Sequence, residues 1–133
     1  MNPRLIFLVD DDPDDLMLIK EAISTIDKKF EFQEATDGRH ALNFLRALDS
    51  VHKHPCLIVL DINMPVLGGR DALAILKNDP GLKHIPIVVF STSSNPADTE
   101  YCKQFGVELI TKPFDMSRLI EAAKRLISYC GDQ

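Results

Sequence analysis

Acidic residues are concentrated near the start of the chain, directly behind a run of apolar residues. The stretch LVDDDPDDL holds five aspartates within six positions: Asp10, Asp11, Asp12, Asp14 and Asp15. Carboxylates packed this closely repel one another, and each raises the free energy needed to ionise its neighbours. Solvent, a helix N-terminus or a bound cation can offset that repulsion.

Three other polar residues follow apolar runs in the same way. Asp61 follows LIVL, Ser91 follows IVVF and Lys112 follows VELIT. If these runs are parallel strands, their C-terminal ends meet at one rim, where such folds place their site. Together with Asp10 and Asp11, the rim would then carry three carboxylates, one hydroxyl and one ammonium group. A divalent cation would neutralise the excess negative charge, and oxygen ligands without Cys or His suit Mg²⁺.

A partly open metal site beside an ammonium group and a hydroxyl group is suited to hold a phosphoryl group. Two residues are candidates to attack it. Ser91 would need a general base, and the motif around it contains no histidine. Asp61 needs no base, because a carboxylate attacks phosphorus directly. Asp61 is therefore the favoured phosphoacceptor.

Taken singly, the same residues have ordinary structural explanations. Asp12, Asp14 and Asp15 are expected to cap and begin a helix, where acidic side chains suit the helix dipole. Ser91 is typical of a turn, and a lysine before proline is commonly a surface residue. The joint placement behind four strands, rather than any one residue, is what indicates a site.

Strand and helix signals alternate along the chain. Continuous apolar runs at 5–9, 57–60 and 87–90 are typical of strands buried on both faces of a parallel sheet. The stretches 30–35 and 107–111 are partly polar and predict edge strands. Between the strands, apolar residues recur at helical spacing, as in Leu16, Ile19, Ile23 and Ile26.

Helix boundaries are also marked in the sequence. Asp12 and Asn95, each followed by proline, predict helix starts, and Asp115 can cap the last helix. The NDPGL stretch at 78–82 predicts the end of the third helix. We therefore expect an α/β fold with five βα units. Its doubly wound parallel sheet would have the flavodoxin-like order 2-1-3-4-5, with the site in the crevice between strands one and three.

Composition narrows the class of protein. A length of 133 residues suits one domain spanning 1–133, and we expect no output domain. A formal net charge of −5 argues against direct binding of nucleic acid. No apolar stretch reaches membrane-spanning length, and the N-terminus lacks the features of a signal peptide.

Cysteine and histidine residues give weaker signals. Cys56, Cys102 and Cys130 are odd in number and widely spaced, which predicts reduced thiols in a cytoplasmic protein. The HKH stretch at 52–54 could bind a metal ion but lacks further ligands nearby. We expect it to be a solvated loop before Pro55.

At the site positions the chain resembles the CheY-like receiver domain of bacterial response regulators. The motifs VDDD (9–12), LDINMP (60–65), VVFSTS (88–93) and TKPFD (111–115) occur in the order and spacing of that family, as does Gly69. The resemblance covers essentially the whole chain. Within the family, STSSNPAD and DSVHKHPC are similar to single-domain regulators paired with phytochrome-type or hybrid sensor kinases.

The resemblance implies a role for each site residue. Asp61 would be phosphorylated, with Ser91 and Lys112 contacting the phosphoryl oxygens as the catalytic pair. Mg²⁺ would be held by four protein ligands: Asp10, Asp11, Asp61 and the backbone carbonyl of Asn63.

The resemblance also implies a cis Lys112–Pro113 bond. At two positions, however, the chain departs from the family. The family usually has Asp where this chain has Gly68, which predicts a looser loop after the third strand. Leu109 stands where the family usually has Tyr or Phe, the ring that turns inward on phosphorylation. The usual aromatic readout is therefore in question.

The expected function is a phosphoacceptor response regulator, a cytoplasmic signalling protein rather than an enzyme. A sensor histidine kinase or histidine phosphotransfer protein would donate to Asp61, and a separate target protein would receive the signal. One alternative is a phosphorylation-independent interaction module on the same fold. Another is a haloacid-dehalogenase-type phosphatase, which needs a second Asp where this chain has Asn63.

Overall fold

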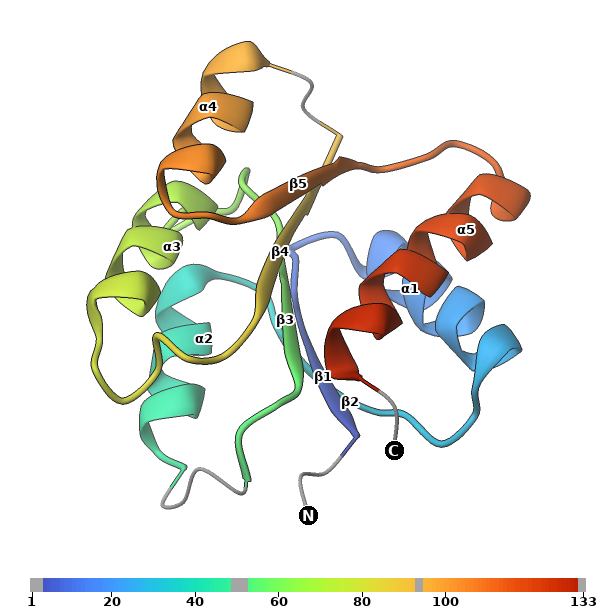
Figure 1. Cartoon of the computed structure of the whole chain (residues 1–133), viewed down its shortest axis with the longest axis horizontal. Coiled ribbons are helices and arrows are strands. Elements are labelled where there is room, and N and C mark those ends of the chain that lie inside the picture. Colours follow the sequence, from blue (N-terminus) through green and yellow to red (C-terminus); the bar gives the residue numbers. More distant parts are fainter. Residues whose placement is uncertain (1–3, 49–52, 93–94, 132–133) are drawn as a thin grey trace.

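The fold is known from a computed structural model that describes residues 4–48, 53–92 and 95–131. At its centre lies a five-stranded parallel sheet with the order β2-β1-β3-β4-β5, as expected (Figure 1). The strands are β1 (Leu5–Val9), β2 (Glu31–Ala35), β3 (Leu57–Leu60), β4 (Ile87–Ser91) and β5 (Glu108–Thr111).

Helices cover both faces of the sheet. Figure 1 shows α1 and α5 on one face and α2, α3 and α4 on the other. Their bounds are α1 (Pro13–Ile26), α2 (Gly38–Arg46), α3 (Gly69–Asn78), α4 (Pro96–Gln104) and α5 (Met116–Ile127), followed by the short 3₁₀ helix η2 (Ser128–Cys130). Each face therefore buries its own apolar cluster, with Ile23 and Leu126 on the first side and Leu42 and Leu73 on the second.

Strand burial follows the predicted division into centre and edge. All residues of β3 and β4 are buried, and only Leu5 of β1 is partly exposed. The outer strands β2 and β5 alternate or remain partly exposed. Helices on both faces thus explain the continuous apolar runs of the central strands.

The predicted helix boundaries are confirmed. The side chain of Asp12 accepts hydrogen bonds from the backbone at the start of α1, and Asn95 and Asp115 cap α4 and α5 in the same way. The third helix ends at Asn78, where the NDPGL stretch begins. In contrast, α3 begins behind Gly68 without a side-chain cap.

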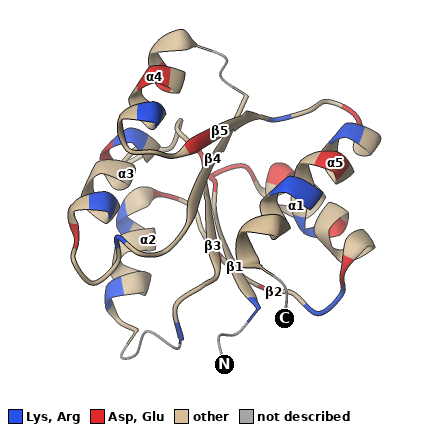
Figure 2. Ribbon diagram, viewed as in Figure 1, with Lys and Arg blue, Asp and Glu red and all other residues tan. Residues whose placement is uncertain are grey.

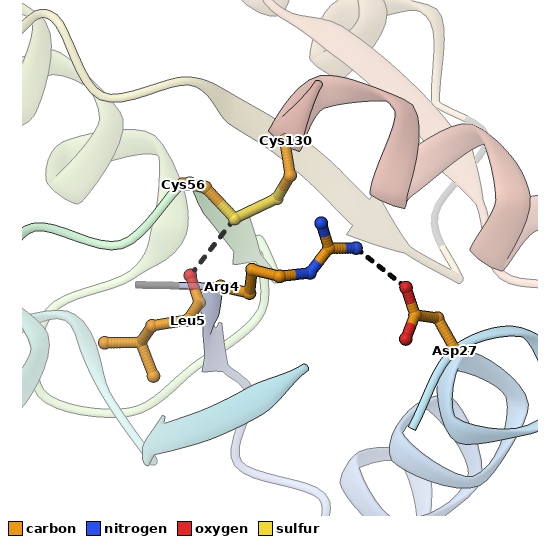
Figure 3. Close-up of a disulfide and its surroundings, with 5 residues drawn as sticks. All are labelled: Arg4, Leu5, Asp27, Cys56 and Cys130. Atoms are coloured by element: carbon orange, nitrogen blue, oxygen red, sulfur yellow. Dashed lines mark hydrogen bonds and ion pairs between the residues drawn. A yellow bond between two sulfur atoms is a disulfide. The ribbon is translucent and has the colours of Figure 1, made fainter. Parts of the chain in front are cut away.

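The cysteines differ from the prediction of three reduced thiols. Cys56, just before β3, forms a disulfide with Cys130 at the end of η2, and Cys102 is free and buried (Figure 3). The two residues are 74 positions apart, yet their Cα atoms lie 5.0 Å apart. Their spacing in the sequence carries no trace of this contact, because the fold alone brings the last turn of the chain to the start of β3.

The interpretation of HKH as a solvated loop is wrong for His54. His54 is buried, and its Nδ1 lies 3.0 Å from Nε2 of His84. The two rings stack with their centroids 5.0 Å apart. This contact forms because β3 and β4 are neighbours, so the segments before them also meet. His52 lies outside the described residues.

No helix in the part of the chain that the structure describes is long and apolar enough to cross a membrane.

Candidate functional site

Three aspartates meet at the C-terminal ends of β1 and β3, as predicted. The two strands are neighbours, and the backbone N–H of Asp61 donates to the carbonyl of Val9 at 2.9 Å. Potential ligand oxygens of Asp10, Asp11 and Asp61 all lie within 4.8 Å of one another. Asp10 and Asp61 are buried, whereas Asp11 is exposed. Figure 2 shows the acidic segment after β1 at the same end of the sheet as the basic position after β5.

Lys112, which directly follows the edge strand β5, brings a positive charge to this cluster. Its backbone N–H donates to the carbonyl of Ser91 at 2.8 Å, which fixes the start of its segment against β4. Its ammonium group donates to Asp10 at 2.6 Å and to Asp15 at 2.8 Å. Burial alone would lower the pKa of Lys112, but these two hydrogen bonds and the charge of Asp61 outweigh it and raise that pKa.

Asp15 is a site residue that the sequence reasoning missed. It was expected only as an acid in the first turn of α1, and it does lie there. Its carboxylate, however, points toward the sheet and binds Lys112 directly. No sequence signal separates it from Asp14, because the rotation of the helix against the sheet decides which acid faces the site.

Asp61 lies in an environment that disfavours its charge. Burial and the nearby charge of Asp10 raise its pKa to about 6, although Lys112, the Ser91 hydroxyl and the Ile62 N–H act in the opposite direction. The Ile62 N–H donates to Asp61 at 2.9 Å. Near neutral pH the carboxylate is therefore mostly ionised but not strongly stabilised by its protein partners.

The remaining predicted site residues are Ser91, the last residue of β4, and Asn63, which lies after β3. Ser91 is fully buried at the end of β4, and its side chain hydrogen-bonds Asp61. Asn63 is exposed in the segment after β3.

The prediction of a cis Lys112–Pro113 bond is wrong, because the described residues contain no cis peptide. The trans isomer is the form that an X–Pro bond favours by about 0.5–1 kcal/mol unless its surroundings select cis.

The segment behind Asp61 returns close to the backbone of that residue at Gly69, and the looser loop expected from Gly68 stays a prediction. A Cβ atom at Gly69 would lie 2.1 Å from the carbonyl oxygen of Asp61, so only glycine fits this approach. Gly68 has a negative φ of −74°, which other residues also adopt.

Val66 shows strain in the same segment. Its φ is +66°, and the N–H of Leu67 donates to the carbonyl of Pro65 at 2.7 Å across it. This hydrogen bond between residues two apart closes a γ-turn of the rare, strained kind. A β-branched residue is poorly suited to positive φ, so the strain is stored beside the acidic cluster.

The donor set fits a hard divalent cation. Carboxylate oxygens without Cys or His are the ligands that Mg²⁺ and Mn²⁺ accept. Among the described residues, this is the only group of three or more potential metal-ligating side chains. With Asp15 included, the site holds four carboxylates and one ammonium group, so it is one charge more negative than the sequence suggested.

The family model for "response regulator receiver domain" matches residues 6–124 of the chain. Among curated proteins, the chain is 33% identical to the response regulator Rcp1 of Synechocystis sp., over 96% of this chain and 88% of Rcp1. It is 32% identical to the polar-differentiation response regulator DivK of Brucella anthropi, over 98% of each chain.

Solved structures agree with these relatives. The phosphorylated cyanobacterial phytochrome response regulator RcpA superposes with a TM-score of 0.84 at 37% identity, covering 95% of this chain and 92% of RcpA. The Mn²⁺-bound form of Rcp1 superposes with a TM-score of 0.83 at 33% identity, covering 95% and 93%. Both are similar to this chain over nearly the full length of the fold.

Proposed function

The chain belongs to the response regulator receiver family, and from that premise we propose that it is a phosphoacceptor switch of two-component signalling, phosphorylated on Asp61 in the presence of Mg²⁺. The observation that carries the proposal is the position of the Asp61 carboxylate. It is buried beside Asp10 and Asp11 at the meeting point of β1 and β3, within hydrogen-bonding reach of Ser91.

The proposed reaction is a transfer from a phosphohistidine. An Asp61 oxygen attacks phosphorus, the bond from phosphorus to the histidine nitrogen breaks, and the nitrogen keeps the electron pair. Mg²⁺ bound at the carboxylates would supply positive charge that offsets the negative charge of the phosphoryl oxygens. The Ser91 hydroxyl and the Lys112 ammonium donate hydrogen bonds to those oxygens. Asp10, Asp11, Asp61 and the Asn63 carbonyl are the proposed metal ligands.

The proposed partners follow from this chemistry. The donor is a sensor histidine kinase or a histidine phosphotransfer protein, and the likeness to the phytochrome response regulator RcpA supports a phytochrome-type kinase. Because a histidine kinase makes its phosphohistidine from ATP, we place the protein in the cytoplasm. Its role is regulatory rather than metabolic, and a separate target protein reads the phosphorylated state without direct contact to nucleic acid.

Phosphorylation by acetyl phosphate tests the proposal without a cognate kinase. Wild-type protein should gain one phosphoryl group with Mg²⁺ and none with EDTA, as measured by intact mass. Asp61→Asn should gain none, whereas Asp71→Asn, at an exposed aspartate in the first turn of α3, should label like wild type. A wild-type protein that binds Mg²⁺ but never labels would instead support the phosphorylation-independent interaction module.

A further inference from the structure

Asp15 and Asp10 share the one ammonium group that the proposed reaction uses. The carboxylate of Asp15 accepts from Lys112 at 2.8 Å, and that of Asp10 accepts from the same atom at 2.6 Å. The Lys112 side chain is 10% exposed, so solvent does little to screen these contacts. An ammonium group has three N–H donors, and two are committed to carboxylates here.

Asp15 also belongs to the site by its surroundings. Together with Asp10 and Asp61 it lines a small cavity of about 10 Å³ between α1 and the sheet, whose other lining residues are apolar, such as Leu16 and Phe90. This volume matches about one water molecule. The neighbouring Asp14 is exposed on the same helical turn, which leaves Asp15 as the acid of that turn that faces the site.

Given the proposed function, we infer that Asp15 is a positioning residue that holds Lys112 in the resting state and competes with the phosphoryl group for it. No metal ligand role is assigned to Asp15. Its contribution is one negative charge and one hydrogen-bond acceptor at the lysine. An arriving phosphoryl group must then draw Lys112 away from Asp15 or share it.

This role makes the two ligands of the site respond in opposite directions when the charge is removed. In Asp15→Asn the cluster loses one negative charge, and Lys112 binds Asp10 more closely, so Mg²⁺ should bind more weakly. The same change removes one of the two carboxylates that hold Lys112, and with it the repulsion of Asp15 toward an anion, so a phosphoryl group should bind more tightly. Each shift should be at least about threefold, because one unit charge about 6 Å away has an effect of that size even at the dielectric constant of water.

The experiment measures both affinities on the full chain by calorimetry. Mg²⁺ is titrated alone, and beryllofluoride, an analogue of the phosphoryl group, is titrated at saturating Mg²⁺. Asp14→Asn is the matched control, because it removes the same charge one residue away from an exposed carboxylate that does not bind Lys112. Opposite shifts in Asp15→Asn, absent or much smaller in Asp14→Asn, support the inference.

Two results would overturn it. Equal behaviour of Asp15→Asn and Asp14→Asn would reduce Asp15 to an ordinary acid of the first helical turn. Loss of both affinities in Asp15→Asn would mean that Asp15 only supports the fold of the site. If wild-type protein binds neither Mg²⁺ nor beryllofluoride, the proposed function itself fails, which is a separate outcome.

Discussion

The carboxyl group of Asp61 is buried in surroundings that disfavour its charged form. The residue is 7% exposed, and burial is the largest cause of its raised pKa of about 6. A carboxyl group with a higher pKa in the folded chain than in the unfolded chain binds its proton more tightly when folded. The free energy of unfolding therefore falls as pH rises from about 3.8, the pKa in the unfolded chain, to about 6, the pKa in the folded chain. The loss is complete above this range.

Replacing Asp61 with asparagine should consequently stabilise the metal-free protein. A shift from 3.8 to about 6 corresponds to roughly 2–3 kcal/mol at about pH 7.5, and this advantage should shrink to about 1 kcal/mol near pH 4.5. Urea unfolding of Asp61→Asn and wild type in EDTA at the two pH values measures it. Asp71→Asn, an exposed change of the same kind, should show no such advantage. An Asp61→Asn advantage that is equal at both pH values would contradict the account.

At the same scale, the sequence predicted most but not all of the site. Asp10, Asp11 and Asp61 follow directly behind strands, so the topology alone brings them together. Asp15 was assigned to the helix only, because its direction depends on how α1 is rotated against the sheet. The strain at Val66 was also not foreseen, since it arises from a turn whose φ the sequence does not reveal.

Among the elements, the helix starts and the central strands could be predicted, because the interactions that determine them join residues close together in the sequence. Asp12, Asn95 and Asp115 cap the helices that they were predicted to cap, because a cap needs only the next two or three backbone N–H groups. Apolar runs identified the central strands for a similar reason. The contacts that were missed, Cys56 with Cys130 and His54 with His84, join distant segments.

The disulfide links two elements at the end of the sheet away from the acidic cluster. Cys56 precedes the first residue of β3, whereas Asp61 follows its last residue. The bond fastens η2 to the N-terminal end of β3 beside β1, where the Cys56 sulfur lies 3.4 Å from the carbonyl oxygen of Leu5 (Figure 3). Stability and site chemistry should therefore respond separately to reduction.

Reduction with dithiothreitol should lower the free energy of unfolding by about 2–4 kcal/mol, because the bond closes a long loop of the unfolded chain. Urea unfolding with and without reductant measures this loss. The Mg²⁺ affinity at the opposite end of β3 should stay unchanged. Cys130→Ser provides the control, since it should match the reduced wild type and show no further effect of reductant. A wild-type unfolding curve that ignores reductant would argue against the disulfide.

For the whole molecule, the open question is how a phosphoryl group at Asp61 changes a distant surface. Leu109 of β5 pairs with Val89 of β4 and packs, partly buried, against the apolar cluster under α2, α3 and α4. A ligand shifts a conformational equilibrium only through interactions that differ between the states. Leucine has no hydroxyl group that favours an outward position, so Leu109 can remain packed in both states.

A second constraint limits movement of α4. Arg70, at the start of α3, forms an ion pair with Asp98 of α4 at 2.6 Å, and its carbonyl accepts from the Tyr101 hydroxyl at 3.0 Å. These contacts tie α4 to the helix that begins directly behind the Asp61 segment. The fixed helix pair and the apolar Leu109 together argue for a small response on the surface of α4, β5 and α5.

We therefore expect beryllofluoride with Mg²⁺ to act mainly on the segment from Ser91 to Asn95, of which 93–94 lie outside the described residues. Amide chemical shifts with and without beryllofluoride measure the response at each residue. Leu109→Tyr restores the ring that the family usually carries, and it should enlarge the changes along β5 and α5. Leu109→Met is the control for a change of side chain without a ring. Large wild-type shifts centred on Leu109 and α5, with few at Ser91, would refute this account, as would a Leu109→Tyr response identical to wild type.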